Sequence, residues 1–123
     1  MLRVILIVLT AIAVTSAHGQ GYPSRPIRYI VPQAPGGSSD TLARIVTQRA
    51  AEGLGQQLVV DNRPGATGII GAEVVARANP DGYTLLQVAT SHATNPAMQA
   101  KLPYDTMRDF AAISLLSQRG PCA

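Results

Sequence analysis

The stretch "IVPQAPGGSSDTLARI", residues 30–45, joins a short apolar run to a segment with helical spacing. The run "IRYIV", residues 27–31, is rich in β-branched side chains, which predicts a buried strand that ends at Pro32. Two prolines and a Gly-Gly pair then constrain the backbone of the connection. The stretch therefore predicts a strand–loop–helix unit.

An amphipathic helix is expected at residues 41–54, where apolar side chains recur at steps of three and four. Ser38 or Ser39 is suited to the N-cap, Asp40 to the first turn and Gly55 to the end of the helix. The stripe expected to face the core consists of Leu42, Ile45, Val46, Ala50 and Leu54.

The same order of elements recurs along the rest of the chain. Further strands are predicted at residues 57–62 and 83–89, with a helix at residues 69–78 between them. Asn95, followed by a proline, is typical of an N-cap that opens a short helix. Residues 111–117 predict a fourth strand. Alternating strands and helices predict an α/β fold with a parallel sheet, flanking helices and right-handed crossovers.

Composition and charge exclude several classes of partner. Hydrophobic residues are 46% and charged residues 14% of the 123 residues, a globular balance that suits one domain or part of one. The net charge is +3 without a run of Lys or Arg, so no nucleic acid is expected as a partner. Cys122 is the only cysteine and no metal-site spacing occurs, so neither an internal disulfide nor a metal is predicted.

The N-terminus has the three-part layout of a secretory signal peptide. Arg3 gives a positive start, residues 4–14 are apolar, and small residues follow. Cleavage is expected after Ala17 or after Gly19, so residues 1–19 are interpreted as the signal and residues 20–123 as the mature chain. The apolar run is short for a bilayer span, so we expect export without membrane insertion after cleavage.

In a parallel sheet the strand-to-helix loops emerge at the carboxyl edge, where open α/β sheets bind ligands. The three loops here are "PQAPGGSSD", "NRPGATG" and "TSHATNP". Free N–H groups at helix starts, approached closely at glycines, predict an uncharged pocket for a carboxylate or a phosphate. Helix capping alone would also explain Ser38, Ser39 and Asn95. Asp40 is either a cap or a partner for a donor group on the ligand.

Enzyme chemistry has weaker support. "GATGIIG", residues 65–71, follows a strand and enters a helix, so a nucleotide-dependent α/β enzyme fragment is the alternative function. The next strand ends in "QVATS" without the acidic residue that would hold a ribose. Gly37 is not followed by the Lys of a phosphate-binding loop, and Ser91 with His92 lacks the G-x-S-x-G turn of a hydrolase.

Three segments carry a resemblance to a known family. They read "YPSRPIRYIVPQAPGGSSDTLAR", "GQQLVVDNRPGATGIIGAEVVARANPDGYTLL" and "NPAMQAKLPYDTMRDFAAISLL". This pattern, from about residue 22 to about residue 117, resembles the extracytoplasmic receptors of tripartite tricarboxylate transporters, often called Bug receptors. The combination of P-x-A-P-G-G, N-R-P-G-A and P-D-G-Y-T-L in this order is highly specific.

The resemblance implies a periplasmic solute-binding protein with two α/β domains and a ligand cleft between them. It also implies a small organic acid as ligand, the membrane components of the transporter as partners, no cofactor and no enzyme activity. Residues carried over by matching position as ligand-binding are Ala34, Pro35, Gly36, Gly37, Ser38, Ser39, Asp40, Ser91, His92, Ala93, Thr94 and Asn95. A third loop is less certain and comprises Gly65, Ala66, Thr67 and Gly68.

Two features depart from the family pattern. Gln33 stands where the family usually has an aromatic residue, which changes the packing beside the ligand. The chain ends well short of half the usual family length, in "RGPCA". We therefore expect the N-terminal part of the first domain of a truncated receptor, with one wall of the cleft and weak or no binding alone. A third reading is a remnant that folds poorly.

Overall fold

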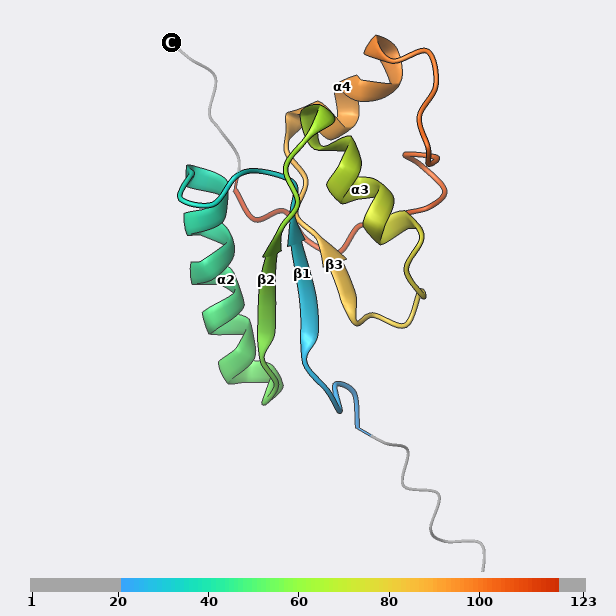
Figure 1. Cartoon of the computed structure of the whole chain (residues 1–123). Helices are drawn as coiled ribbons and strands as arrows, with labels where there is room; N and C mark the ends of the chain where they lie inside the picture. The colour runs from blue at the N-terminus through green and yellow to red at the C-terminus, as the bar shows by residue number, and fades with distance from the viewer. Residues whose placement is uncertain (1–20, 118–123) are drawn as a thin grey trace, which may run out of the picture.

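Three parallel strands form the centre of the computed structural model, which describes residues 21–117 (Figure 1). They are β1 (Ile27–Val31), β2 (Leu58–Asn62) and β3 (Thr84–Leu86), in the order β2-β1-β3. Tyr29 of β1 is in register with Val60 of β2 and Leu85 of β3. The predicted parallel α/β sheet is therefore confirmed.

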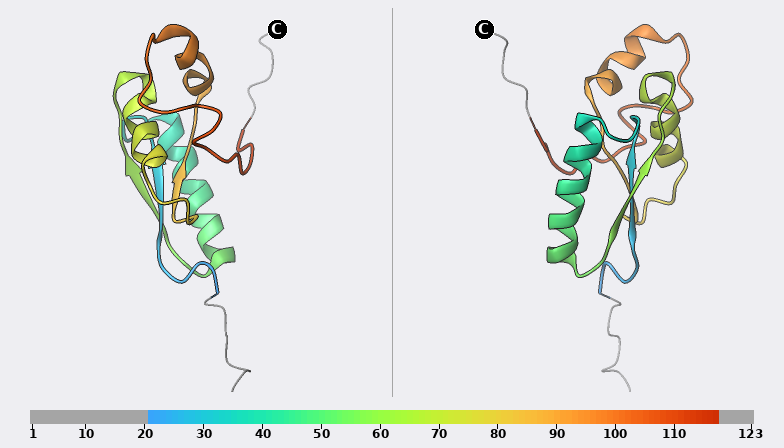
Figure 2. Two further views of the ribbon diagram at one scale, coloured as in Figure 1. Left: turned by 90° about the vertical axis from the view of Figure 1, so that its right-hand side faces the viewer. Right: turned by 60° about the vertical axis from the view of Figure 1, so that its left-hand side comes forward.

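Four helical segments follow the strands. The chain passes from β1 through α2 (Ser38–Leu54) to β2, and from β2 through the short η1 (Ala66–Gly68) and α3 (Ile69–Ala76) to β3. Helix α4 (Thr90–Met98) follows β3. Figure 2 shows α2 and α3 on opposite faces of the sheet. Right-handed crossovers require this arrangement, because the connection from β1 to β2 and the connection from β2 to β3 run in opposite directions along the sheet.

The core lies on both faces of β1. On the α2 face, Tyr29 and Val31 pack with Ala43, and Val60 and Leu85 complete the cluster. On the α3 face, Ile30 and Ala72 are buried. A Cβ on Gly71 of α3 would lie 2.8 Å from Pro32 Cβ, so this glycine lets α3 approach the end of β1 closely.

Helix α2 differs from the expectation at its start and in its buried face. It begins at Ser38 with Gly37 as N-cap and without a side-chain cap, so the predicted serine cap is wrong. Asp40 lies in the first turn, and Gly55 ends the helix with φ 66°, as predicted. The buried residues are Asp40, Ala43 and Thr47, whereas Ile45 is 57% exposed. Small residues face the sheet because they allow the helix to lie close to it.

The chain after β2 also differs from the expectation. The second helix ends at Ala76, and β3 is shorter than predicted. Helix α4 begins at Thr90 and contains Pro96, so the predicted N-cap at Asn95 is wrong. Pro96 cannot donate a helix hydrogen bond, and α4 ends two residues later at Met98.

The predicted fourth strand is also wrong, because residues 111–117 are exposed and pair with no strand in the described part of the chain. A short apolar run becomes a strand only where a partner strand is available.

No helix within residues 21–117 is both long enough and apolar enough to cross a membrane. The expected signal peptide, its cleavage site and Cys122 lie outside the described residues.

Candidate ligand-binding site at the carboxyl edge of the sheet

The connections after the three strands meet at one edge of the sheet (Figure 1). We call residues 32–37 the first loop, residues 63–68 the second loop and residues 87–89 the third loop. A Cβ on Gly68 of the second loop would lie 3.4 Å from Pro32 Cβ and 3.8 Å from Ser91 Oγ, so the first loop, the second loop and the first turn of α4 converge there. A small recess at this point is lined by Pro32, Thr67, Gly68, Ala72, Leu86, Val88, Ala89, Ser91, His92 and Asn95.

The recess brings together some of the predicted site residues but not all. Thr67, Gly68, Ser91, His92 and Asn95 line it, whereas residues 34–40 do not. The sequence analysis missed the apolar part of the lining, namely Pro32, Ala72, Leu86, Val88 and Ala89. Pro32 could have been predicted as a lining residue, because it directly follows the buried strand at the ligand-binding edge.

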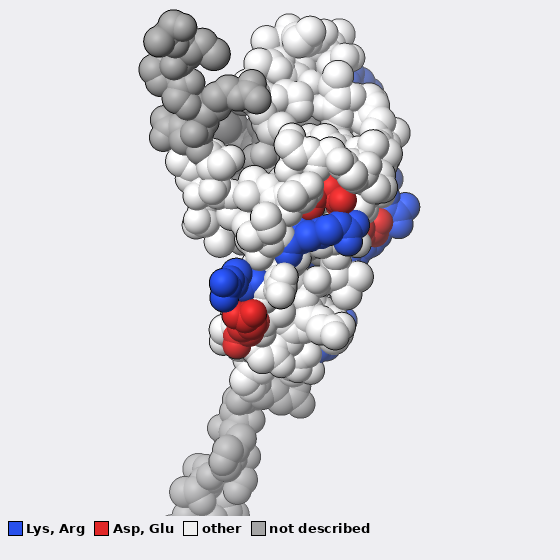
Figure 3. All heavy atoms as spheres, turned by 90° about the vertical axis from the view of Figure 1, so that its left-hand side faces the viewer, with Lys and Arg blue, Asp and Glu red and all other residues white. Residues whose placement is uncertain are grey.

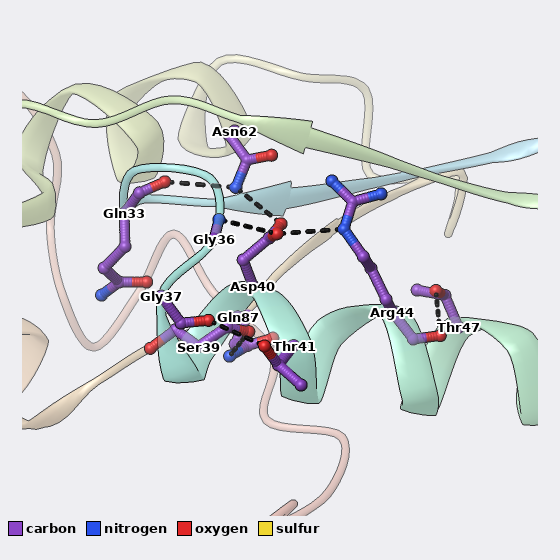
Figure 4. Close-up of polar contacts among 10 residues, drawn as sticks. All are labelled: Gln33, Gly36, Gly37, Ser39, Asp40, Thr41, Arg44, Thr47, Asn62 and Gln87. Atoms are coloured by element: carbon purple, nitrogen blue, oxygen red, sulfur yellow. Dashed lines mark hydrogen bonds and ion pairs between the residues drawn. The ribbon is translucent and has the colours of Figure 1, made fainter.

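Asp40, in the first turn of α2, binds the backbone of the first loop (Figure 4). Its side chain is 6% exposed. Oδ2 accepts hydrogen bonds from Arg44 Nε and from the Gly36 N–H, each at 3.0 Å, and Oδ1 accepts one from Asn62 Nδ2 at 3.0 Å. The bonds from Arg44, Gly36 and Asn62 lower the pKa of Asp40 to about 2. The carboxylate is therefore ionised at neutral pH and engaged by the protein through both oxygens.

Asn62 and Gln87 connect the first loop and the start of α2 to the neighbouring strands. Asn62 Nδ2 at the end of β2 also donates to Gln33 O at 3.2 Å. Gln87, just after β3, donates through Nε2 to Ser39 O at 3.1 Å (Figure 4). Sequence reasoning placed Asn62 at the end of a strand and the start of the second loop, and Gln87 in a strand, without assigning either side chain a role. They fix the backbone beside Gly36, which has φ 81°, a value that favours glycine.

The second loop has an unusual backbone. Gly65, Ala66, Thr67 and Gly68 have φ values of 133°, 46°, 53° and 90°. Two of these residues carry a Cβ, and side chains disfavour this region of backbone conformation. We call residues 65–68 the left-handed turn. It directly precedes α3 and presents Thr67 and Gly68 to the recess.

Aromatic rings surround His92 of α4. Its ring stacks on Tyr104 with centroids 5.8 Å apart and meets Phe110 edge-on at 5.0 Å. Burial lowers the pKa of His92, because desolvation disfavours the charged imidazolium. The ring is therefore neutral at pH 7 and packs the segment after α4 against the recess.

None of the recess-lining residues is Asp, Glu, Lys or Arg. Figure 3 shows the side of α2, where basic and acidic side chains lie next to one another rather than in separate patches. Ion pairs on the described part of the chain include Arg44 with Asp40 and Arg63 with Asp61. The recess thus offers a ligand backbone N–H groups, hydroxyls, the His92 imidazole, the Asn95 amide and apolar surface, but no side chain of Asp, Glu, Lys or Arg.

A larger hollow of about 260 Å³ lies at the opposite, amino edge of the sheet. Arg25, Arg28 and Tyr83 are among its lining residues. Arg25 pairs with Asp81, and Arg28 pairs with Asp61, which Arg63 shares, so both guanidinium groups already have carboxylate partners. Among residues 21–117, no group of His, Cys, Asp and Glu could hold a metal ion.

A family model described as "Tripartite tricarboxylate transporter family receptor" matches residues 42–121. The chain belongs to this family. The resemblance found in the sequence is therefore confirmed, and the members of this receptor family are solute-binding proteins. The family gives no support to the dinucleotide-binding alternative at residues 65–71.

A curated relative and two solved structures illustrate the similarity. A UPF0065 protein of Bordetella bronchiseptica is 46% identical over 108 residues, which are 87% of this chain and 32% of the relative. The periplasmic binding protein BugD is 39% identical with TM-score 0.70, over 72% of this chain and 30% of its own. MatC from Rhodopseudomonas palustris, solved with bound malate, is 40% identical with TM-score 0.72, over 77% of this chain and 33% of its own. The chain spans about a third of the length of the relative it matches.

Proposed function

We propose that this chain forms one wall of a periplasmic receptor that captures a small organic acid for the membrane components of a tripartite tricarboxylate transporter. The observation that carries the proposal is the convergence of three strand-to-helix connections on an uncharged recess at the carboxyl edge. Such edges are where open α/β sheets bind ligands. Family membership and the malate bound to MatC favour a carboxylate over a phosphate.

The groups around the recess suit a carboxylate without a salt bridge. The first turn of α4 forms one side through Ser91 and His92. The His92 N–H donates to Ala89 O at 3.0 Å, so the N–H of Ser91, the second residue of the helix, is the one of the two without an intrahelical acceptor. The Ser91 hydroxyl adds a donor. The recess volume is about 10 Å³, room for one water, so the ligand carboxylate sits at its mouth. The chain binds the ligand and contributes no catalytic group.

The first loop supplies a second side of the proposed site. Gly37 has φ −82°, and a Cβ there would meet only Ala34 O at 3.7 Å. A larger side chain at this position therefore fits the fold but occupies the space in front of the loop. In the proposed site, residues 34–40 approach the ligand from the α2 side, and Asp40 fixes their backbone by accepting a hydrogen bond from the Gly36 N–H.

The proposal extends to cellular location and to affinity. Residues 1–19 direct export, and cleavage after Ala17 or Gly19 releases the chain into the periplasm. The 123-residue chain binds weakly by itself, because it corresponds to about a third of MatC and has only the contacts of one wall. We expect dissociation constants of roughly millimolar or poorer, near −4 kcal/mol.

Nuclear magnetic resonance (NMR) titration of the processed chain with malate and with citrate tests the proposal. Saturable shifts should appear at the amides of residues 34–40 and 90–95. Ser91→Ala should weaken binding about threefold to tenfold, the worth of one hydrogen bond. Gln48→Ala, at an exposed position on α2, is the matched control and should leave the affinity unchanged. Saturable binding of NAD instead of the acids would favour the enzyme alternative.

A further inference from the structure

The left-handed turn is the most unusual backbone in the described chain. Its four consecutive residues all have positive φ, and two of them, Ala66 and Thr67, are not glycine. Positive φ at such residues costs energy and persists only where surrounding contacts impose it. Within the turn, the Gly68 N–H donates to Gly65 O at 2.9 Å, so any further restraint on its conformation comes from residues outside it.

Asn95 of α4 makes the contacts that hold the turn. Asn95 Nδ2 donates to Thr67 O at 3.3 Å, and Asn95 Oδ1 lies 3.2 Å from Thr67 Oγ1, whose hydroxyl also donates to Ala66 O at 2.7 Å. Asn95 is 3% exposed, although it lies on a short helix whose other residues are mostly exposed. The Asn95 amide thus contacts Thr67, 28 residues earlier in the chain, through both its nitrogen and its oxygen.

The turn and Asn95 also lie at the recess. Thr67, Gly68 and Asn95 all line it, and Gly68 is the point where the first loop, the second loop and the first turn of α4 converge. If Thr67 left the left-handed region, Gly68 would move relative to Pro32 and Ser91. The shape of the recess therefore depends on the bonds between Asn95 and Thr67.

We propose that Asn95 is a positioning residue, which holds the left-handed turn of residues 65–68 in the conformation that the carboxylate site requires. This inference rests on the proposed function. It differs from the role that the resemblance assigns to Asn95, which is contact with the ligand. Its amide groups are engaged by Thr67, and its effect on binding passes through the backbone of residues 65–68.

A double-mutant cycle separates positioning from direct contact. Thr67→Gly replaces a residue that resists φ 53° by one that accepts it, while it keeps the backbone carbonyl that Asn95 binds. The variants are Asn95→Ala, Thr67→Gly and the double variant, with Gln99→Ala as control for loss of an exposed amide at the end of the same helix. NMR titration with malate gives the affinity, and the Cα and Cβ shifts of residues 66–68 report the turn.

We expect Asn95→Ala to weaken malate binding at least tenfold and to move residue 67 out of the left-handed region. In the Thr67→Gly background the same substitution should lower the malate affinity threefold or less, because glycine at position 67 adopts positive φ without a steric penalty. Gln99→Ala should change neither readout. Titrations are run well below each melting temperature, so that lost affinity does not reflect unfolding.

An equal loss of affinity in both backgrounds would overturn the proposal and indicate that Asn95 contacts the ligand. An unchanged turn in Asn95→Ala would overturn it as well. If the unmodified chain does not bind malate, the proposed function fails, and the shifts of residues 66–68 still decide whether Asn95 holds the turn. If Asn95→Ala does not fold alone, the double variant should be more stable than Asn95→Ala, because it lacks one of the two strained residues, Thr67.

Discussion

Gly71→Ala should destabilise the chain although alanine is the better helix former. A Cβ at this position would lie 2.8 Å from Pro32 Cβ, 3.1 Å from Pro32 Cα and 3.1 Å from Arg63 O. Carbon atoms in contact prefer about 3.5–4.0 Å, so α3 must move away from β1 by roughly 1 Å. Neither the proline ring nor the backbone carbonyl can swing aside.

The magnitude follows from two opposing effects. Alanine gains up to about 1 kcal/mol in helix propensity, and forcing an extra methyl into a packed contact costs about 1–3 kcal/mol. After the full propensity gain the net loss is up to about 2 kcal/mol, and each 1 kcal/mol lowers the melting temperature by about 4–8 °C. Thermal unfolding followed by circular dichroism measures it.

The matched control is Gly53→Ala in α2. A Cβ there has nothing within 4 Å, so only the propensity gain remains and the chain should be unchanged or stabilised by up to about 1 kcal/mol. If Gly71→Ala were as stable as Gly53→Ala, the close approach of α3 to Pro32 would be refuted. Absence of any cooperative transition in the unmodified chain would favour the poorly folding remnant.

Three further predictions concern charge, the first loop and export. The folded-state pKa of Asp40, about 2, lies below its ordinary value of 3.8. The stabilising contribution of the ionised Asp40 is therefore present above about pH 4 and is lost as the pH falls from 4 to 2. The free energy of unfolding, measured across this range, should fall less steeply in Asp40→Asn. Gly37→Val should weaken malate binding at least tenfold, about 1.4 kcal/mol, without a comparable drop in melting temperature, and unchanged affinity would return the first loop to a purely structural role. Mass spectrometry of a periplasmic fraction should find a chain that starts at His18 or Gln20, and an intact Met1 in the cytoplasm would contradict export.

The sequence predicted the sheet because its signals are local. The β-branched run of β1, the glycine after α2 and the three- and four-residue steps of apolar side chains act within one element. Predictions failed where distant parts of the chain decide. Residues 111–117 have strand composition but no partner strand in the described chain, and Ile45 faces solvent because α2 approaches the sheet through Ala43.

The same distinction applies to the candidate site. The carboxyl edge and its loops could be predicted, since parallel strands place the loops that follow them at the same edge of the sheet. The contacts of Asp40 with Asn62 and of Asn95 with Thr67 could not, because each joins residues more than twenty positions apart. The strained φ values of Ala66 and Thr67 leave no mark in composition.

The most direct test of the central claim is an NMR titration of the processed chain with malate, mapped onto assigned amides. The account predicts saturable shifts at the carboxyl edge, in residues 34–40, 65–68 and 90–95, with a dissociation constant of roughly millimolar. It predicts no saturable shift around Arg25 and Arg28, which line the larger hollow at the amino edge. Two results would contradict it: saturable shifts confined to the amino edge, or no saturable shift at either edge at malate concentrations up to about 100 times the expected dissociation constant.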